Sequence, residues 1–540
     1  MANPSLQIGN SNWAIKEDNL LGYSTAGTRF LPQPITMTRA SAGTRVNPQG
    51  LIETVELLGS EEIVCGDFEC AVPTDVWDLS TGWTISSGKA RANLVQNQNM
   101  FQAKVYTSGK TYKVTYTISD YDNGTVRFQF GGGGGTDQGE INSSNGVYTE
   151  YITATANHTS SRFRGQLTDG GFTGNIDNVS VKESTKNNLA RVDYDGTASS
   201  LLVEPERTNL VTYSEDFSNA YWLKVGTTVV SGQTSPSYDS PTGAFKLVEG
   251  TTSAEQGIRF TSSITSVVSS FSVMAKYNGR YFRVSGNINV QDYVNFNLQN
   301  GTITRNGGGI TNAKIEHIVD GWYRCTGTYT GGNMNIGVTN DANATYLTNY
   351  TGDGVSGVYI FGSQFEAGSY PTSYIPTSGS SVTRVKDQYE KTGISNLINS
   401  EEGVLFAELS ALSDDGTDRQ ICLRDDTWTN RMFLRLDASS NQITFRYYIG
   451  GSLTVNLLNT LTDITIINKI ACKWELNKFK LYVNGNKVAE DLSANVMGAD
   501  LMNRIAFDDG LGTNVFYGKV KQLQIFKTAL TDPELATLTT

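Results

Sequence analysis

Histidine and cysteine are scarce in this sequence, with two His and five Cys among 540 residues. The histidines, His158 and His317, leave little room for a zinc site or a His-based catalytic triad. Few, scattered cysteines are typical of proteins that fold in a reducing compartment. Only Cys65 and Cys70 lie close together, in "CGDFEC". We expect two free thiols there, with a disulfide as the alternative.

Charge of positive sign is also sparse: charged residues make up 18% of the chain and the net charge is −11. No cluster of Lys and Arg occurs in the sequence, so nucleic-acid binding through phosphates is not expected. No apolar run approaches the roughly 18 residues of a membrane-spanning helix. The opening "MANPSLQIGNSNWAIK" lacks the blocks of a signal peptide. We therefore expect folding in a cytoplasm and no membrane insertion.

Catalytic signatures are missing as well. The sequence has no G-x-S-x-G, no H-E-x-x-H and no Walker loop. Glycosidases need two carboxylates at a fixed separation, and no stretch groups acids and aromatics into such a motif. We therefore predict that the chain is not an enzyme and requires no cofactor.

Short stretches with alternating apolar residues are abundant instead. "YKVTYTIS" places Tyr112, Val114, Tyr116 and Ile118 on one face of a strand. Strand-like stretches recur at short spacing and do not alternate with helices. This pattern predicts an all-β fold of tandem antiparallel β-sandwich (jelly-roll) domains.

Two local signals near the C-terminus are more specific. Asn484-Gly485, between "KFKLYV" and "NKV", predicts a two-residue hairpin because both turn positions need positive φ. Thr531 followed by Glu534 predicts a capping box at the start of a helix.

A chain of 540 residues is too long for one hydrophobic core. Similar three-residue stretches stand at Thr44-Arg45-Val46, Ala190-Arg191-Val192 and Thr383-Arg384-Val385, and we interpret them as joints between units. The predicted divisions are an opening segment (1–57), a first module (58–185), a connecting segment (186–206), a second module (207–380), a linker (381–400) and a third module (401–540).

The stretch "SYPTSYIPTSGSSVTRVKD", residues 369–387, precedes the third module. Pro371 and Pro376 hold a chain extended and keep it from joining a sheet. Because Tyr370 and Tyr374 are expected to pack against the second module, we predict a stiff strap and not a loose linker.

Several longer stretches resemble known families. "GDFE", "GWTISSGKA" and "IDNVSVKE" resemble signatures of carbohydrate-binding-module jelly rolls. "SLLVEPERTNLVTYSEDFSNAYW" and "DGWYRCTGTYT" resemble a module of bacteriophage tail and capsid-associated proteins, and "TMTRASAGTRVNPQGLIE" resembles the leader before such modules. "KLYVNGNKVAED" and "YGKVKQLQIFKTALTDPEL" resemble concanavalin A-like, laminin-G-like sandwiches.

This resemblance implies a structural protein of a bacteriophage virion, made in the cytoplasm of the bacterial host. The protein would be a fibre, a tail component or a capsid decoration that binds host-surface or environmental polysaccharide for adsorption. Its partners would be that glycan and other virion proteins, and a homotrimer is implied by fibre-type proteins. The alternatives are a purely structural virion component without glycan binding and a spike that depolymerises glycans.

Sugar binding on such modules uses an exposed aromatic ring flanked by polar side chains. Trp83, Trp222 and Trp322 occupy strand-like positions and are predicted to be core residues. Trp428 differs, because "RDDTWTNRM" is polar and turn-like. The predicted ligand-binding residues are therefore Trp428 and four tyrosines in or near polar loops: Tyr281, Tyr293, Tyr346 and Tyr350.

Calcium is the metal that the resemblance suggests, because jelly rolls often bind it where the first and last strands meet. The matching acids are Glu69 and Asp177 in the first module, with Asp216 and Glu366 nearest in the second. The alternative is that these acids face solvent or cap turns. "FDDGLG", residues 507–512, is a third candidate loop for calcium or glycan, although a plain turn is the favoured interpretation.

Overall fold

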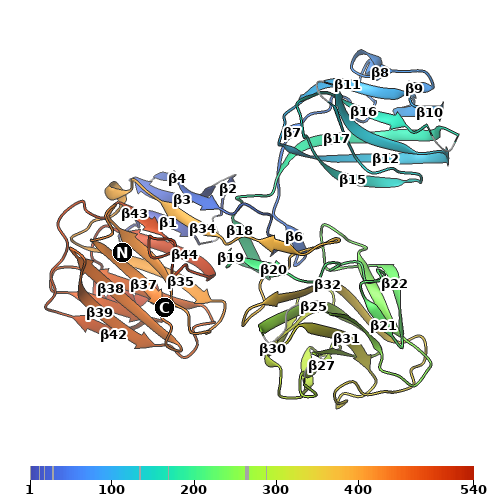
Figure 1. Cartoon of the computed structure of the whole chain (residues 1–540). Helices are drawn as coiled ribbons and strands as arrows, with labels where there is room; N and C mark the ends of the chain where they lie inside the picture. The colour runs from blue at the N-terminus through green and yellow to red at the C-terminus, as the bar shows by residue number, and fades with distance from the viewer. Residues whose placement is uncertain are drawn as a thin grey trace. The chain divides into compact units, whose positions relative to one another are not determined.

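The computed structural model describes residues 2–10, 13–16, 19–26, 29–132, 135–167, 170–261, 267–286 and 289–540. It confirms the all-β fold class: antiparallel sheets dominate (Figure 1). Within the described ranges, no helix has the length and apolar character needed to cross a membrane. The chain forms two compact units, one of Glu56–Lys186 and one of Met1–Val55 with Asn187–Thr540.

The unit Glu56–Lys186 is a sandwich of two sheets around an aromatic core that includes Trp83. The predicted alternation is confirmed, because Tyr112, Val114, Tyr116 and Ile118 all point into this core. One sheet has the order β15-β12-β17-β10-β9, with β7 beside β17: β15 (Gly146–Thr153), β12 (Thr111–Asn123), β17 (Phe172–Thr185), β10 (Lys89–Val95), β9 (Trp83–Ser86) and β7 (Leu57–Glu61). The other has β14 (Gly135–Gln138), β13 (Val126–Gly132), β16 (His158–Gly165), β11 (Asn99–Tyr106) and β8 (Asp78–Leu79), and the 3-10 helix η1 (Pro73–Asp75) precedes β8.

The expectation of two free thiols in this unit is wrong. The structure joins Cys65 and Cys70 in a disulfide. The five-residue separation lets a tight turn bring the two residues together: Cys65 has a positive φ of 56°. The backbone carbonyl of Cys65 also accepts a hydrogen bond from Trp77 Nε1 at 3.0 Å. Cys325, Cys422 and Cys472 remain free and buried.

The second unit contains a middle sandwich of two six-stranded sheets. Its core includes Trp222, and Trp322 lies in a neighbouring cluster, so the three tryptophans assigned to cores are all buried. One sheet runs β21 (Leu223–Val225), β24 (Gly257–Thr261), β31 (Asn333–Thr339), β26 (Tyr281–Ser285), β27 (Tyr293–Asn297) and β28 (Thr302–Asn306). The other runs β22 (Thr227–Gln233), β23 (Ala244–Glu249), β32 (Gly357–Ala367), β25 (Val268–Asn278), β30 (Trp322–Thr330) and β29 (Thr311–His317).

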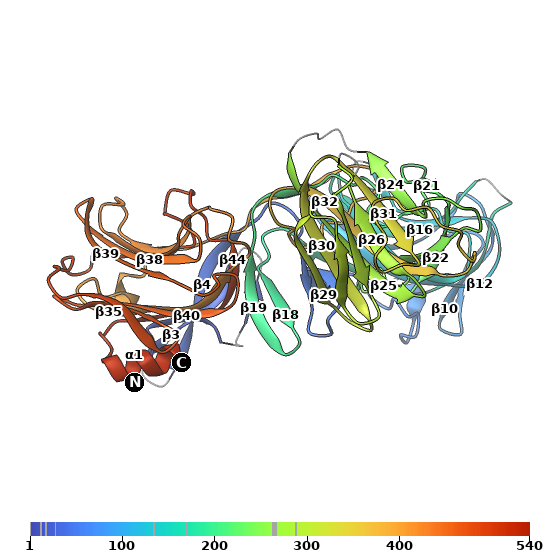
Figure 2. The same ribbon diagram turned by 90° about the horizontal axis from the view of Figure 1, so that it is seen from below.

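The C-terminal sandwich has two layers (Figure 2). One neighbour series is β39-β38-β37-β36-β43 and the other is β42-β41-β40-β35-β44. Their bounds are β35 (Gly403–Ala411), β36 (Arg419–Arg424), β37 (Arg431–Leu436), β38 (Gln442–Ile449), β39 (Ser452–Thr460), β40 (Asn468–Trp474), β41 (Phe479–Val483), β42 (Asn486–Asp491), β43 (Arg504–Ala506) and β44 (Gly518–Phe526).

Both local signals are confirmed in this sandwich. Asn484 and Gly485 have φ of 45° and 86° and connect β41 to β42. Thr531 and Glu534 form the capping box of α1 (Asp532–Thr539). The helix packs on the outside of the second layer through Leu535.

The opening segment, the connecting segment and the linker, which the sequence sets apart from the modules, all supply strands to this sandwich. β1 pairs with β44, β3 and β4 pair with each other, β34 joins β4 to β43, and the β18–β19 hairpin pairs with β44. Alternation within a strand does not reveal which distant strand will pair with it. These elements are β1 (Leu6–Gly9), β2 (Ile15–Lys16), β3 (Asn19–Ala26), β4 (Arg29–Thr38), β18 (Arg191–Asp195), β19 (Ala198–Val203), β34 (Gln388–Lys391) and the 3-10 helix η2 (Ser395–Leu397).

The three stretches interpreted as joints meet in one place, which we call the joint. β5 (Thr44–Val46) pairs with β6 (Ile52–Thr54), and Val46 N donates to Asp193 Oδ1 of β18 at 2.8 Å. β20 (Arg207–Asn209) pairs with β33 (Val382–Arg384). The chain leaves the C-terminal sandwich twice and returns to it twice, at β5, β18, β20 and β33, and all four places lie in the joint.

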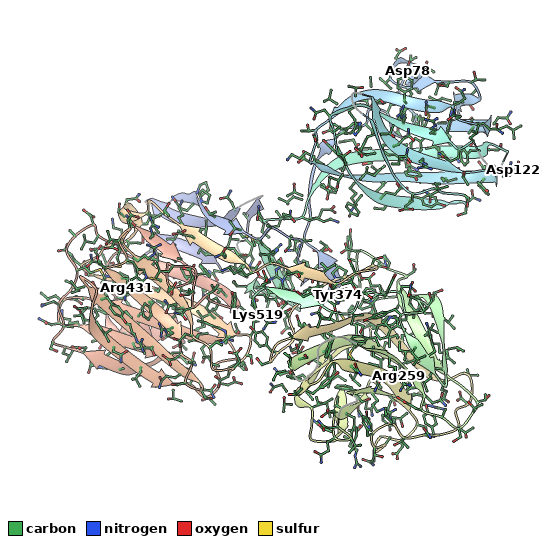
Figure 3. All side chains as sticks on the ribbon, viewed as in Figure 1. Asp78, Asp122, Arg259, Tyr374, Arg431 and Lys519 are labelled. Carbon is green, nitrogen blue, oxygen red and sulfur yellow. A yellow bond between two sulfur atoms is a disulfide. The ribbon has the colours of Figure 1, made fainter. Side chains whose placement is uncertain are left out.

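The strap 369–387 closes this joint. Tyr370 and Tyr374 are both buried, which confirms the predicted packing, and Tyr374 lies in a cluster with Trp322. Figure 3 labels Tyr374. The Tyr374 hydroxyl lies 2.7 Å from Ser214 Oγ and donates to Glu215 Oε1 at 3.0 Å. The strap is thus a packed element of the fold.

Candidate glycan-binding site

The turn that carries Trp428 connects β36 to β37 and is organised by one carboxylate. Asp425 accepts hydrogen bonds from Thr427 Oγ1, Thr429 N and Asn430 Nδ2 at 3.0, 3.1 and 2.8 Å. Burial alone would raise the pKa of Asp425, but the hydrogen bonds from Asn430 and Thr427 hold it below its usual value. An ionised Asp425 therefore fixes the path of the turn.

Trp428 itself stands in an unfavourable backbone conformation. Its φ is +65°, in the left-handed region that bulky residues rarely adopt. The indole Nε1 donates to the Asp509 carbonyl at 2.5 Å, and the Arg431 guanidinium lies 3.5 Å from the ring centroid. The side chain remains partly exposed, as predicted. Strained residues of this kind are held in place by surrounding structure and are frequent at binding sites.

A row of side chains in cation–π and ring contact extends from Trp428 across the outer face of the sheet. Arg431 also lies 3.8 Å from the Tyr448 ring centroid, and Phe433 lies beside Tyr448 with centroids 5.7 Å apart. Arg435 covers Phe433 at 4.9 Å. Figure 3 labels Arg431 on this sandwich. Cation–π contacts and ring packing therefore hold the Trp428 ring in a fixed orientation.

The "FDDGLG" loop lies directly against this turn. Asp509 Oδ1 accepts from Leu511 N at 2.8 Å and Thr513 N at 3.0 Å, which makes the stretch a tight turn. Arg424 Nη2 donates to the Gly510 carbonyl at 2.9 Å. Burial, together with the charge of Asp509, raises the pKa of Asp508. Two stretches that the sequence marked separately thus form one rigid surface.

The predicted tyrosines belong to the middle sandwich and do not join Trp428. Tyr293 is buried and its hydroxyl accepts from Arg305 Nε at 2.7 Å, which argues against ligand contact by this ring. Tyr346 donates to the Gly286 carbonyl at 2.9 Å, and Tyr350 donates to Glu249 Oε2 at 2.6 Å. Tyr281 is partly exposed in β26, opposite Thr339. Internal packing occupies most of these hydroxyls.

The acids marked for calcium do not form a donor set. Glu366 is fully buried and accepts from Thr372 N at 2.5 Å, Thr372 Oγ1 at 2.8 Å and Gln364 Nε2 at 3.0 Å, so it anchors the strap. Asp216 caps its own turn at Ser218, and Asp177 accepts from Asn178 N. Glu69 is exposed near Gly88. In the part of the chain that the structure describes, no group of three or more His, Cys, Asp or Glu side chains could hold a metal ion.

The bracing residues Arg431, Phe433, Arg435 and Tyr448 were missed by the sequence reasoning. Their signal is present in "RMFLRLD", where Arg, Phe and Arg alternate with the core residues Met432 and Leu434. Alternation places them on the outer face, but only the pairing of Arg431 with Tyr448 in β38 brings the stack together.

The described residues form an all-β protein of several antiparallel sandwiches, and the C-terminal sandwich carries a braced aromatic surface at Trp428. No protein-family model matches the chain, and no curated protein sequence matches it. Among solved structures, the chain is similar to the CBM40 of Ruminococcus gnavus IT-sialidase, with 18% identity over 26% of this chain and 84% of that one, at a TM-score of 0.23. It is also similar to the tandem CBM22-1-CBM22-2 domain of Paenibacillus barcinonensis Xyn10C, with 12% identity over 57% of this chain and 98% of that one, at a TM-score of 0.20. At these TM-scores the similarities assign no ligand to this chain.

Proposed function

We propose that the chain is a glycan-binding protein of a bacteriophage virion, a fibre, tail or capsid-decorating component that attaches to host-surface or environmental polysaccharide. The observation that carries the glycan-binding part is the Trp428 turn. An indole that is partly exposed, strained and braced by Arg431 offers a fixed apolar face to a sugar ring. The polar side chains of the turn, Thr427 and Thr429, can hydrogen-bond sugar hydroxyls.

Binding at one such platform is weak, and several copies would be needed for useful attachment. A homo-oligomer would carry one Trp428 platform per chain and so convert low single-site affinity into avidity. The virion part of the proposal is supported by the sequence resemblance of the opening segment and the second module to phage structural proteins. Mass spectrometry of purified phage particles tests it, and absence of the chain from the particles would contradict it.

The glycan-binding part is tested by substituting the platform residue. Trp428→Ala should weaken binding to the best saccharide of a glycan array by at least about tenfold, because the stacking surface is lost. Trp428→Phe keeps a ring but loses the hydrogen bond to Asp509, and should retain part of the affinity. The matched control is Tyr238→Ala, which removes an exposed aromatic ring elsewhere in the same unit and should leave binding unchanged.

The outcomes separate the proposal from its alternatives. Failure of the full-length protein to bind any saccharide or host cell would favour a purely structural virion component. Release of reducing sugar from host polysaccharide would favour a depolymerase. Equal binding by wild type and Trp428→Ala would move the site away from this turn.

A further inference from the structure

Three arginines lie together on the outer face of one sheet in the unit Glu56–Lys186, and we call this surface the arginine face. Arg127 of β13 is opposite Arg164 of β16, and Arg162 of β16 is opposite Phe101 of β11. Their strand neighbours Phe128 and Phe163 point into the core. Because side chains alternate along a strand, the arginines and Phe101 must point outward.

These arginines are held by neutral amide oxygens. Arg127 Nη2 donates to Gln166 Oε1 at 2.9 Å and its Nη1 donates to Gln138 Oε1, while Arg164 Nη2 donates to Asn97 Oδ1. The Gln129 side chain is buried, and its amide oxygen, in the orientation that satisfies both groups, accepts from Arg162 Nε at 2.7 Å and Nη2 at 3.1 Å. Amide partners fix the position of a guanidinium without cancelling its charge.

No carboxylate forms an ion pair with Arg127, Arg162 or Arg164 among the described residues. Burial and the neighbouring charge of Arg164 lower the pKa of Arg162, as expected where like charges gather. One acid, Asp78 of β8, lies at the sheet edge beyond Phe101 (Figure 3). In a chain of net charge −11, this surface therefore has a local excess of positive charge.

The donors on this face suit a carboxylate. A guanidinium has five N–H donors, and the contacts above use one or two on each arginine. Arg127 Nε is buried, but the remaining donors can bind a carboxylate through two parallel hydrogen bonds, which is the geometry that arginine favours. Arg162 and Arg164 are two residues apart on one strand face, so one acidic group can contact either or both.

Phe101 adds an apolar surface beside these donors. It is partly exposed and shares the face with Arg162, its cross-strand partner. A sugar ring can lie against the phenyl ring while a carboxylate on that sugar reaches the guanidinium groups. Neutral sugars would gain only the packing against Phe101, and small inorganic anions only the hydrogen bonds to the guanidinium groups.

We propose that the arginine face binds polysaccharide whose sugars carry carboxylates, such as uronic acids or sialic acids. This inference deepens the proposed glycan-binding function by adding a second site, in the other unit, with a defined ligand class. It does not depend on Trp428, so the two sites can fail or succeed separately. The ligand charge, not ring stacking alone, would then decide which host surfaces are recognised.

Binding of the full-length protein to oligogalacturonate, measured by isothermal titration calorimetry, tests the proposal. The same oligomer with its carboxyl groups reduced to alcohols is the neutral probe. We expect at least about tenfold tighter binding of the acidic oligomer, weakening as salt rises. Arg162→Gln combined with Arg164→Gln should remove this preference. The single variant Arg162→Lys should retain only part of the preference for the acidic oligomer, because lysine keeps the charge but loses the bidentate geometry.

Arg91→Gln is the matched control, since Arg91 is an exposed arginine of β10 in the other sheet of the same unit. It should leave the acidic preference unchanged, and so should Trp428→Ala. Circular dichroism melts check that each variant folds. Because sialic acids carry the carboxylate in a different setting, polysialic acid serves as a second acidic probe.

Three results would overturn the proposal. The first is equal affinity for the acidic and reduced oligomers together with no binding of polysialic acid. The second is an equal loss in Arg91→Gln and in the double variant, which would indicate a diffuse charge effect. The third is binding of poly(glycerol phosphate) without binding of either carboxylate polymer, which would assign the face to phosphate.

Discussion

The arginines at the joint and those on the arginine face differ in their partners. At the joint, Arg39 contacts Asp387 at 2.7 Å and Arg384 contacts Glu204 at 2.9 Å. Arg191 contacts Glu204 at 2.5 Å and also pairs with Asp387. All five side chains are almost fully buried. On the arginine face, amide oxygens replace the carboxylates and the side chains remain partly exposed.

Arginine therefore has two uses in this protein, as a buried partner of acids and as a charged surface group. A buried guanidinium must have its charge compensated inside the protein, so the joint brings acids from different segments against its arginines. Ser373 of the strap donates to Glu204 through both N and Oγ at 2.7 Å, which ties the strap to the same network. An arginine with neutral partners at the surface keeps its charge available for a ligand.

Acidification should break the joint, and we expect it to have the largest effect. Burial would raise the pKa of Glu204 and Asp387, but the charges of Arg384 and Arg191 lower both below their ordinary values of 4.5 and 3.8. For such depressed groups, the stability they contribute is present above about pH 4 and is lost as pH falls through their folded-state pKa values. The unit that contains the joint should therefore unfold at markedly lower urea concentration in acid.

Pulse proteolysis with pepsin in urea at pH 5.5 and pH 3.5, with the cut sites assigned by mass spectrometry, measures this separately for each unit. In the unit Glu56–Lys186, burial would likewise raise the pKa of Glu56 and Asp137 and hydrogen bonds lower both, but these side chains are more exposed than Glu204 and Asp387. Because each has fewer buried charge partners than the acids of the joint, this unit should lose less stability in acid. The acid effect on the joint should shrink in Glu204→Gln. Equal losses in both units would mean that the network does not set acid stability.

Removing one carboxylate of the joint should have the next largest effect. Asp387→Asn leaves Arg39 and Arg191 without their shared charge partner, which should cost about 3–5 kcal/mol of unfolding free energy. Glu53→Gln is the matched control, because the Arg45–Glu53 pair is partly exposed and should cost about 0–1 kcal/mol. Urea unfolding of the unit that contains the joint measures both. If Asp387→Asn changed the unfolding free energy only slightly, the network would fix the geometry of the joint without stabilising the fold.

Local patterns in the sequence predicted local structure well. Tyr112 and its alternating neighbours, the Asn484-Gly485 hairpin and the Thr531 cap depend on residues within a few positions of one another. The Arg-Val stretches were interpreted as joints between modules, and their common meeting place was not foreseen. It depends on pairings such as β1 with β44, whose members lie at opposite ends of the chain.

In the candidate sites, too, local features could be predicted from the sequence and long-range contacts could not. Trp428 could be singled out because its neighbours are polar and turn-like, whereas its bracing by Arg431 and the "FDDGLG" loop required the fold. The arginine face was missed because "TVRFQF" and "SSRFRGQ" lie some 30 residues apart, so no local cluster of basic residues appears. Only the pairing of β13 with β16 places these arginines side by side.

The disulfide of the unit Glu56–Lys186 gives a third difference in stability between the two units, and we expect it to be the smallest. Closing the short loop between Cys65 and Cys70 should stabilise this unit by about 2 kcal/mol through reduced chain entropy. Reduction, or substitution of both residues by serine, should therefore lower its urea midpoint. The unit that contains the joint should not respond, because Cys325, Cys422 and Cys472 are free and buried. Urea unfolding with and without reductant distinguishes the units, and a shift in both would imply that the folding of one unit depends on the other.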